Sequence, residues 1–163
     1  MPGTVLTLAA VAALAVAPEC GGARSGSEFA DRLVAVAQHE SGFRPLAVNV
    51  NGLPPAMQPK PATVEEAVDA VRLWAARINP ATGKPYTVDA GLMQVNSANF
   101  ARHGLTPETA FDVCANVRAG ADHLAVDWQA AAVWQASHSR YNTGSFVRGA
   151  AYAAGIERVL ARV

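Results

Sequence analysis

Hydrophobic residues at helical spacing predict a first amphipathic helix between Ser27 and Gly42. Phe29, Leu33 and Val36 follow one another at intervals of four and three residues, with charged and polar residues between them. The glycine at the end of this segment can adopt the left-handed conformation that terminates a helix. We therefore expect one helix with a single apolar face, ending at about Gly42.

Further helices are expected along the rest of the chain. Thr63 is suited to cap a helix that runs to about Arg77, and Thr106 precedes a proline that can open another helix. Apolar residues from Val113 to Trp128 recur at helical spacing, which predicts a central buried helix. Three more segments favour helices, with a turn over 140–145 between the last two: 91–100, 130–139 and 149–163.

Two short segments alternate in polarity and predict a small β element. Residues 47–52 end in an Asn-Gly pair, and residues 84–89 could pair with them in a sheet of two or three strands. The proline-rich segment 53–61 between them is expected to be an irregular loop. Because alanine is abundant and strand-forming runs are few, the sequence predicts a mainly α (α+β) domain.

Composition bounds the size and partners of the protein. The chain has 163 residues, 51% hydrophobic and 16% charged, which is enough for one sizeable core. We therefore expect residues 18–163 to form a single domain. Lys plus Arg number 13, as do Asp plus Glu, so the formal net charge of zero argues against nucleic acid as a partner.

Residues 1–17 carry no charged side chain and end in Ala15-Val16-Ala17, a small-x-small pattern that signal peptidase accepts. This segment is interpreted either as a signal peptide for export to the periplasm or as an apolar first helix of the mature fold. It has no lysine or arginine near its start, so both interpretations stay open at this point.

Cys20 and Cys114 lie far apart, and neither has the neighbouring Cys or His ligands of a zinc site. In an exported protein they could form a disulfide, and otherwise they would be two buried thiols. The four histidines, at positions 39, 103, 123 and 138, also lack metal-binding spacing. We expect no metal and no cofactor.

Glu40 is the first candidate for chemistry, because it continues the apolar face of the first helix, four residues after Val36. Burial disfavours its anion, and so does the negative end of the helix dipole, so both effects should raise its pKa. A carboxylic acid that stays protonated near neutral pH can protonate a glycosidic oxygen. The alternative is that Glu40 points into solvent or pairs with Arg44.

The segments around and after Glu40 together resemble the soluble lytic transglycosylase family, which has a goose-type lysozyme-like fold. Within that family, the chain is most similar to the small peptidoglycan-cleaving proteins of type IV secretion and conjugation systems. The resemblance covers roughly residues 20 to 160 and follows the family's order of motifs. These motifs are 39–43 (HESGF), 49–52 (NVNG), 91–96 (GLMQVN), 114–116 (CAN) followed by Gly120, and 140–144 (RYNTG).

The resemblance implies that Glu40 is the sole catalytic acid/base and that Ser41 orients it or contacts the substrate. It also implies a set of residues that line the glycan groove or hold the sugar beside the scissile bond: Met93, Gln94, Asn116, Tyr141 and Asn142. By residue type alone, these side chains could equally be core, capping or packing residues. The subgroup places a tyrosine after a glycine in the final helix, where this chain has Gly155-Ile156. Tyr152, one turn earlier, is the candidate to replace it.

The resemblance implies a lytic transglycosylase that cleaves the MurNAc-GlcNAc β-1,4 bond of peptidoglycan and leaves a 1,6-anhydromuramyl product. Such an enzyme opens the cell wall locally for a type IV secretion or conjugation apparatus, whose components would be its partners besides the glycan strands. The only second acid near a motif is Asp89, so a one-carboxylate mechanism with substrate assistance is expected. The alternatives are a lysozyme-type hydrolase of the same bond and a non-catalytic peptidoglycan-binding scaffold.

Overall fold

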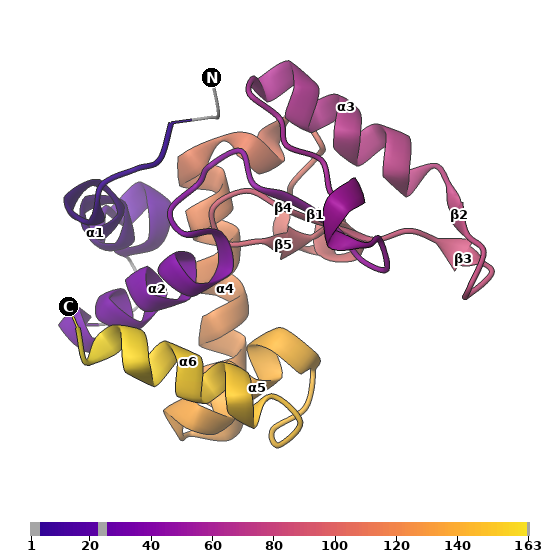
Figure 1. The fold of residues 1–163 in the computed structure, drawn as a ribbon. Helices are drawn as coiled ribbons and strands as arrows, with labels where there is room; N and C mark the ends of the chain where they lie inside the picture. Colours follow the sequence, from indigo (N-terminus) through magenta and orange to yellow (C-terminus); the bar gives the residue numbers. More distant parts are fainter. Residues whose placement is uncertain (1–3, 23–25, 163) are drawn as a thin grey trace.

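The computed structural model describes residues 4–22 and 26–162, which form six α-helices and five short strands (Figure 1). The expected mainly α architecture with a small sheet is confirmed. The helices are α1 (Leu8–Val16), α2 (Gly26–Ser41), α3 (Val64–Ala75), α4 (Val113–Ala131), α5 (Trp134–Thr143) and α6 (Ala150–Leu160). The strands are β1 (Val48–Val50), β2 (Ile78–Asn79), β3 (Lys84–Pro85), β4 (Val88–Ala90) and β5 (Val95–Asn96).

The three central strands form an antiparallel sheet in the order β1-β4-β5. Val48 is opposite Ala90, and Ala90 is in turn opposite Val95. The expected pairing of 47–52 with 84–89 is therefore confirmed for β4. It is wrong for Lys84-Pro85, which pairs with Ile78-Asn79 in a separate hairpin beyond the end of α3 (Figure 1).

The expected helix over 91–100 is wrong. Gly91 and Gln94 both adopt left-handed backbone conformations, with φ of +78° and +48°, which a right-handed helix cannot include. The Gln94 N–H donates to the Gly91 carbonyl at 3.2 Å and closes a tight turn between β4 and β5. A short 3₁₀ turn, Ser97–Asn99, follows the second of these strands.

Two helix ends also differ from the expectation. The chain after Thr106 forms a 3₁₀ turn, Thr109–Phe111, and α4 begins only at Val113. Asp112 caps this helix, because its carboxylate accepts from the Ala115 N–H at 2.7 Å. Residues 140–143, expected as a turn, belong to α5, which ends where Gly144 becomes left-handed.

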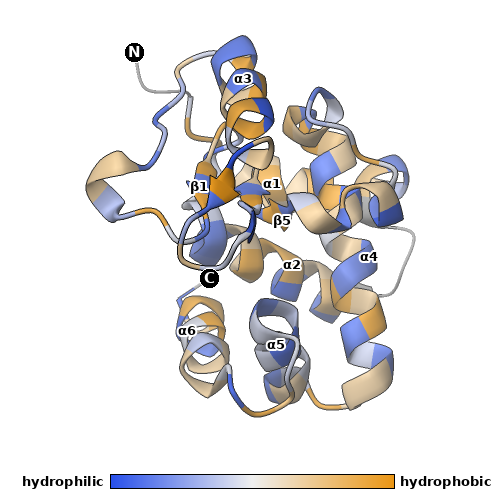
Figure 2. Cartoon of the chain, turned by 90° about the vertical axis from the view of Figure 1, so that its right-hand side faces the viewer, coloured by the Kyte–Doolittle hydropathy of each residue, from blue (hydrophilic) through white to orange (hydrophobic). Residues whose placement is uncertain are grey.

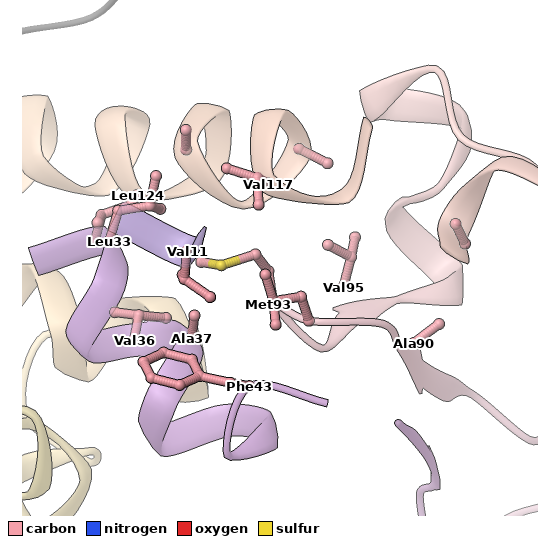
Figure 3. Close-up of a cluster of buried hydrophobic side chains, with 14 of the residues drawn as sticks. Val11, Leu33, Val36, Ala37, Phe43, Ala90, Met93, Val95, Val117 and Leu124 are labelled. Carbon is pink, nitrogen blue, oxygen red and sulfur yellow. The ribbon is translucent and has the colours of Figure 1, made fainter. Parts of the chain in front are cut away.

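Buried side chains from α2, α4 and the sheet belong to one hydrophobic cluster, part of which is shown in Figure 3. Leu33 and Val36 of α2 contribute the apolar face expected from the sequence, and each is no more than 1% exposed. Val117 and Leu124 of α4 are also buried, which confirms the central helix. The hydropathy colouring shows that α5, by contrast, is a polar helix (Figure 2).

Helix α1 packs on α2, with Val11 and Ala15 each 2% exposed. Residues 8–16 can therefore be accommodated as a first helix, while export and removal of residues 1–17 stay predictions. Within the described part of the chain, no helix combines the length and hydrophobicity required to span a membrane.

Cys20 and Cys114 form a disulfide between residues 94 apart in sequence, with Cα atoms 4.7 Å apart. The bond joins a short π-helical turn, Pro18–Gly22, to the first turn of α4. Closing a loop of this length can stabilise the fold by about 4 to 5 kcal/mol in the chain-entropy model. Because the two cysteines are bonded to each other, the alternative of two buried thiols is wrong.

Candidate active site

Glu40 lies in the last turn of α2 and is half-buried. The helix ends directly after it because Gly42 and Phe43 are both left-handed, with φ of +59° and +61°. The Tyr152 hydroxyl donates to Glu40 Oε1 at 2.5 Å. Arg44, the alternative partner, instead donates from Nε to the Ser41 carbonyl at 2.8 Å, so it does not neutralise Glu40 through this contact.

Tyr152 reaches Glu40 because α6 lies close along α2 (Figure 1). A Cβ atom on Gly155 would lie 2.5 Å from the His39 ring, so any larger residue here would require this ring to move. The same histidine packs edge-on against Tyr152, with ring centroids 4.9 Å apart. Ile156, where the subgroup has its tyrosine, is fully buried in the core. Tyr152 thus makes a contact with the catalytic candidate that Ile156 cannot make.

The surroundings of Glu40 favour its protonated form. Burial and, less strongly, the nearby charge of Asp89 raise its pKa to about 7, against the opposing effect of the hydrogen bond from Tyr152. Near neutral pH, Glu40 therefore exists in comparable amounts as acid and as carboxylate. A group in this state can give a proton to a leaving oxygen and then accept one from another hydroxyl.

Two hollows meet at Glu40, with volumes of about 440 and 600 Å³, each in the size range of ligand pockets. They share residues from four different parts of the chain, so we treat them as one groove with two arms. The helix arm extends to His123 and Arg140, and the loop arm extends to the 58–61 segment. The shared residues are Glu40, Asn51, Asp89, Gln94 and Asn142.

Asp89 is the second carboxylate of the groove, and three side-chain amides surround it. Asn96 donates to Oδ1 at 2.6 Å, while Asn51 and Asn49 donate to Oδ2 at 3.0 and 3.4 Å. Burial raises the pKa of Asp89, and the three amides oppose that effect because they stabilise its anion. A carboxylate in this setting retains its charge more readily than Glu40 does.

From the sequence, Asp89 was expected to lie near a motif, with no role in the site. A signal was present in the strand register, because Asn49 is directly opposite Asp89, and Asp89 is directly opposite Asn96. Side chains opposite one another in an antiparallel sheet project from the same face. The alternation within 47–52 therefore predicts an amide beside the carboxylate, once the pairing with β4 is assumed.

Gln94, Tyr141 and Asn142 all line the helix arm of the groove. The Gln94 amide donates to the carbonyls of Ala47 and Gly91, which holds its side chain across the turn before β5. The Tyr141 hydroxyl donates to the Met93 carbonyl at 3.1 Å, and burial raises the pKa of this phenol. Asn142 is exposed at the junction of the two arms.

Met93 was expected to be an apolar wall of the groove, but its side chain is fully buried in the core (Figure 3). It packs against Gly120 of α4, where an added Cβ would lie 2.7 Å from Met93 Cγ. The tight turn at 91–94 directs this side chain inward, so its structural role is to pack α4 against the sheet.

Asn116 and Ser41 are also buried, at 1% and 2% exposure, and support the groove from behind. Asn116 accepts from the Met93 N–H at 2.7 Å and donates to the carbonyls of Ala90 and Ala110. Its amide therefore fixes the 91–94 turn and does not face the groove. The Ser41 hydroxyl donates to the Ala37 carbonyl at 3.1 Å, within its own helix.

No group of three or more His, Cys, Asp or Glu side chains that could hold a metal ion occurs in residues 4–22 and 26–162. The described groove instead combines one acid poised near neutral pH with a hydrogen-bonded carboxylate and several amides. Amides and hydroxyls are suited to hydrogen-bond the many polar groups of a sugar chain.

Comparison with known proteins places these features in a family. Residues 27–161 match the model of the Transglycosylase SLT domain. The chain is 35% identical over 125 residues to the protein virB1 of Rhizobium radiobacter, a match that covers 72% of this chain and 48% of the relative. It is 29% identical over 126 residues to the type IV secretion system protein virB1 of Brucella abortus, covering 72% and 49%.

The chain thus spans about half the length of the curated relatives it matches. No solved structure gives a significant match. The family match includes Glu40, both arms of the groove and Tyr152. The chain belongs to the SLT transglycosylase domain family.

Proposed function

We propose that the protein is a lytic transglycosylase that cleaves the MurNAc-GlcNAc β-1,4 bond of peptidoglycan and leaves a 1,6-anhydromuramyl end. The observation that carries this proposal is the half-buried Glu40, with a pKa raised to about 7, at the junction of both arms of the groove. Membership of the family supports the same reaction.

In the proposed mechanism, Glu40 acts first as an acid and then as a base. Tyr152 occupies Oε1, so the transferable proton resides on Oε2, which protonates the glycosidic oxygen. The substrate's own N-acetyl carbonyl stabilises the cation that develops as the bond breaks. The Glu40 carboxylate then removes the proton of the muramyl 6-hydroxyl, whose oxygen closes the anhydro ring.

A second candidate is a lysozyme-type hydrolase of the same bond, and Asp89 is the observation that favours it. Asp89 lines the same groove as Glu40, and three amides support its anion. Most glycosidases that use water have two catalytic carboxyl groups. The two candidates differ in which oxygen captures the cation and therefore in the new end of the product.

The biological setting is also proposed. Both relatives described above are named virB1, and the one from Brucella abortus is named as a type IV secretion system protein. This supports a role in opening the cell wall for such an apparatus, in the periplasm, after export directed by residues 1–17. Mass measurement of the mature protein tests the last point, because removal of the leader would leave a chain that begins after Ala17.

Digestion of purified peptidoglycan sacculi tests the proposed reaction. We expect wild type to release anhydromuropeptides, and Glu40→Gln to lower the rate by about 10² to 10⁴, because it removes the transferable proton. Glu65→Gln, on the exposed first turn of α3, is the matched control and should keep wild-type activity.

The products distinguish the candidates. Reducing ends that depend on Glu40 would favour the hydrolase. If neither protein releases soluble fragments while both bind sacculi, the protein is a scaffold and the proposed reaction is wrong.

A further inference from the structure

Arg140 lies in the helix arm of the groove, next to Tyr141, and the mechanism above does not use it. Its side chain is 31% exposed, and Nε lies 3.5 Å from Asp127 Oδ1. Its guanidinium carbon also lies 5.2 Å from the centroid of the Phe146 ring. The guanidinium is therefore contacted on one edge by Asp127 and on one face by Phe146, while Arg140 lines the groove.

Asp127 holds Arg140 from behind the groove. It is 3% exposed on α4 and also approaches His123, with Oδ2 3.4 Å from Nε2. A guanidinium has five N–H donors in a rigid fork, and Nε carries only one of them. The contact with Asp127 thus orients the fork and leaves other donors for a ligand, which is how arginine binds carboxylates with two parallel hydrogen bonds.

Charges in the helix arm make Arg140 the cation that a ligand would meet there. Its other ionisable lining residues, apart from tyrosine, are Glu40, Asp89 and His123. Burial and, less strongly, positive neighbours lower the pKa of His123 to about 4, so this ring is neutral near neutral pH. Arg140 thus places a fixed positive charge in an arm that otherwise contains the carboxylates of Glu40 and Asp89 and neutral amides suited to a sugar.

Peptidoglycan supplies an anion at regular positions. Its sugar backbone is neutral, but each muramyl residue bears a lactyl group, which ends either in a free carboxylate or in a peptide with carboxylates of its own. Building on the proposed function, we propose that Arg140 binds a carboxylate of the muramyl substituent. The helix arm therefore selects substituted muramyl residues over unsubstituted sugars.

Binding to three oligosaccharides of equal length tests this assignment in a Glu40→Gln background, where cleavage does not interfere. The first is a neutral GlcNAc oligomer, the second alternates GlcNAc with MurNAc bearing free lactyl carboxylates, and the third carries stem peptides. Arg140→Gln should weaken binding of carboxylate-bearing ligands by about tenfold and leave the neutral oligomer unchanged, because it removes a charge-assisted contact.

Arg118→Gln is the matched control: it makes the same change on an exposed part of α4 outside both arms and should alter none of the affinities. Arg140→Gln leaves the buried Asp127 carboxylate without the charge of Arg140, which can impair folding. The double variant Arg140→Gln/Asp127→Asn avoids this because it removes both charges. It should reproduce the same selective loss if the single variant folds poorly.

The outcomes separate this inference from the proposed reaction, because binding is measured without catalysis. Loss for the free-lactyl ligand alone assigns the contact to the lactyl carboxylate, and loss for the peptide-bearing one alone assigns it to the stem peptide. Loss for both shows that Arg140 accepts either carboxylate. Equal loss for the neutral oligomer, or no loss for any ligand in the folded double variant, overturns the assignment.

Discussion

The two walls of the groove hold their carboxylates in different ways. On the helical wall, Glu40 stands at the end of α2 and accepts one short hydrogen bond, from the Tyr152 hydroxyl. On the strand wall, Asp89 accepts from three asparagine amides in the same row of the sheet and its adjoining turn. Burial raises the pKa of both groups, so desolvation alone does not distinguish them.

The difference lies in how much each wall supports the anion. Hydrogen bonds to a carboxylate favour its charged form, and Asp89 receives three of them. Glu40 receives one. Burial and, less strongly, the charge of Asp89 oppose its ionisation, so its pKa reaches about 7. Two carboxylates in unlike environments can thus take unlike roles: Glu40 as proton donor and Asp89 as the anion that stabilises positive charge on the sugar.

Among the variants that test the two walls, Asp89→Asn is expected to change the activity most. It removes the anion of the strand wall, so we expect kcat/KM on sacculi to fall by about 100-fold, the usual consequence of losing an electrostatic stabiliser. The active form of Glu40 is protonated, and the charge of Asp89 raises its pKa. The alkaline limit of activity should therefore move to lower pH, as measured by the pH dependence of sacculus solubilisation.

Asp31→Asn, on the exposed face of α2, is the control for this change and should leave both the rate and the pH profile as in wild type. An unaltered rate in Asp89→Asn, with an unmoved alkaline limit, would show that the strand wall has no electrostatic role. Glu40 would then act alone, as the one-carboxylate mechanism expected from the sequence requires.

The parts of the fold that depend on local patterns were predictable. The apolar face containing Leu33 and the capping residue Thr63 both specify helices through neighbours within one or two turns, and both helices are present. The segment 91–100 was not predictable in this way. Its turn depends on a left-handed Gln94, and glutamine is a residue type that rarely adopts this conformation.

The site was predictable where a single element positions the residue. Glu40 follows from the periodicity of one helix, whereas its contact with Tyr152 requires the close packing of two helices at Gly155. Met93 and Asn116 were assigned to the groove by resemblance, but the direction of each side chain depends on a turn formed by distant partners. The motifs thus predicted which segments surround the site. They did not predict which side chains within those segments face the groove.

Tyr152→Phe tests the helical wall, with a smaller expected effect and a pH shift of the opposite sign. The phenylalanine ring should keep the packing on His39 but lose the hydroxyl that lowers the pKa of Glu40. The pKa of Glu40 should therefore rise, and the alkaline limit of activity should move to higher pH. We expect a rate loss of up to about tenfold near neutral pH, the scale of one neutral hydrogen bond.

Tyr86→Phe, whose ring packs edge-on against Trp74 away from the groove, is the matched control. Movement of the alkaline limit to lower pH in Tyr152→Phe would contradict the contribution assigned to the Tyr152 hydrogen bond. The alkaline limit would then move in the same direction in Asp89→Asn and in Tyr152→Phe, and these shifts would not distinguish the two walls.

The smallest effect is expected from Asn51→Ala, which removes one of the three amides from Asp89. Asn51 is exposed and donates to Asp89 Oδ2 at 3.0 Å, so its loss should raise the pKa of Asp89 and change the rate by about two- to fivefold. Because Asp89 acts as an anion, the acid limit of activity should move to higher pH while the alkaline limit stays in place. Asn49→Ala, which removes a longer contact of 3.4 Å, should have a still smaller effect. A shift of the alkaline limit instead would mean that Asn51 acts through Glu40, and the two walls would then form one coupled unit.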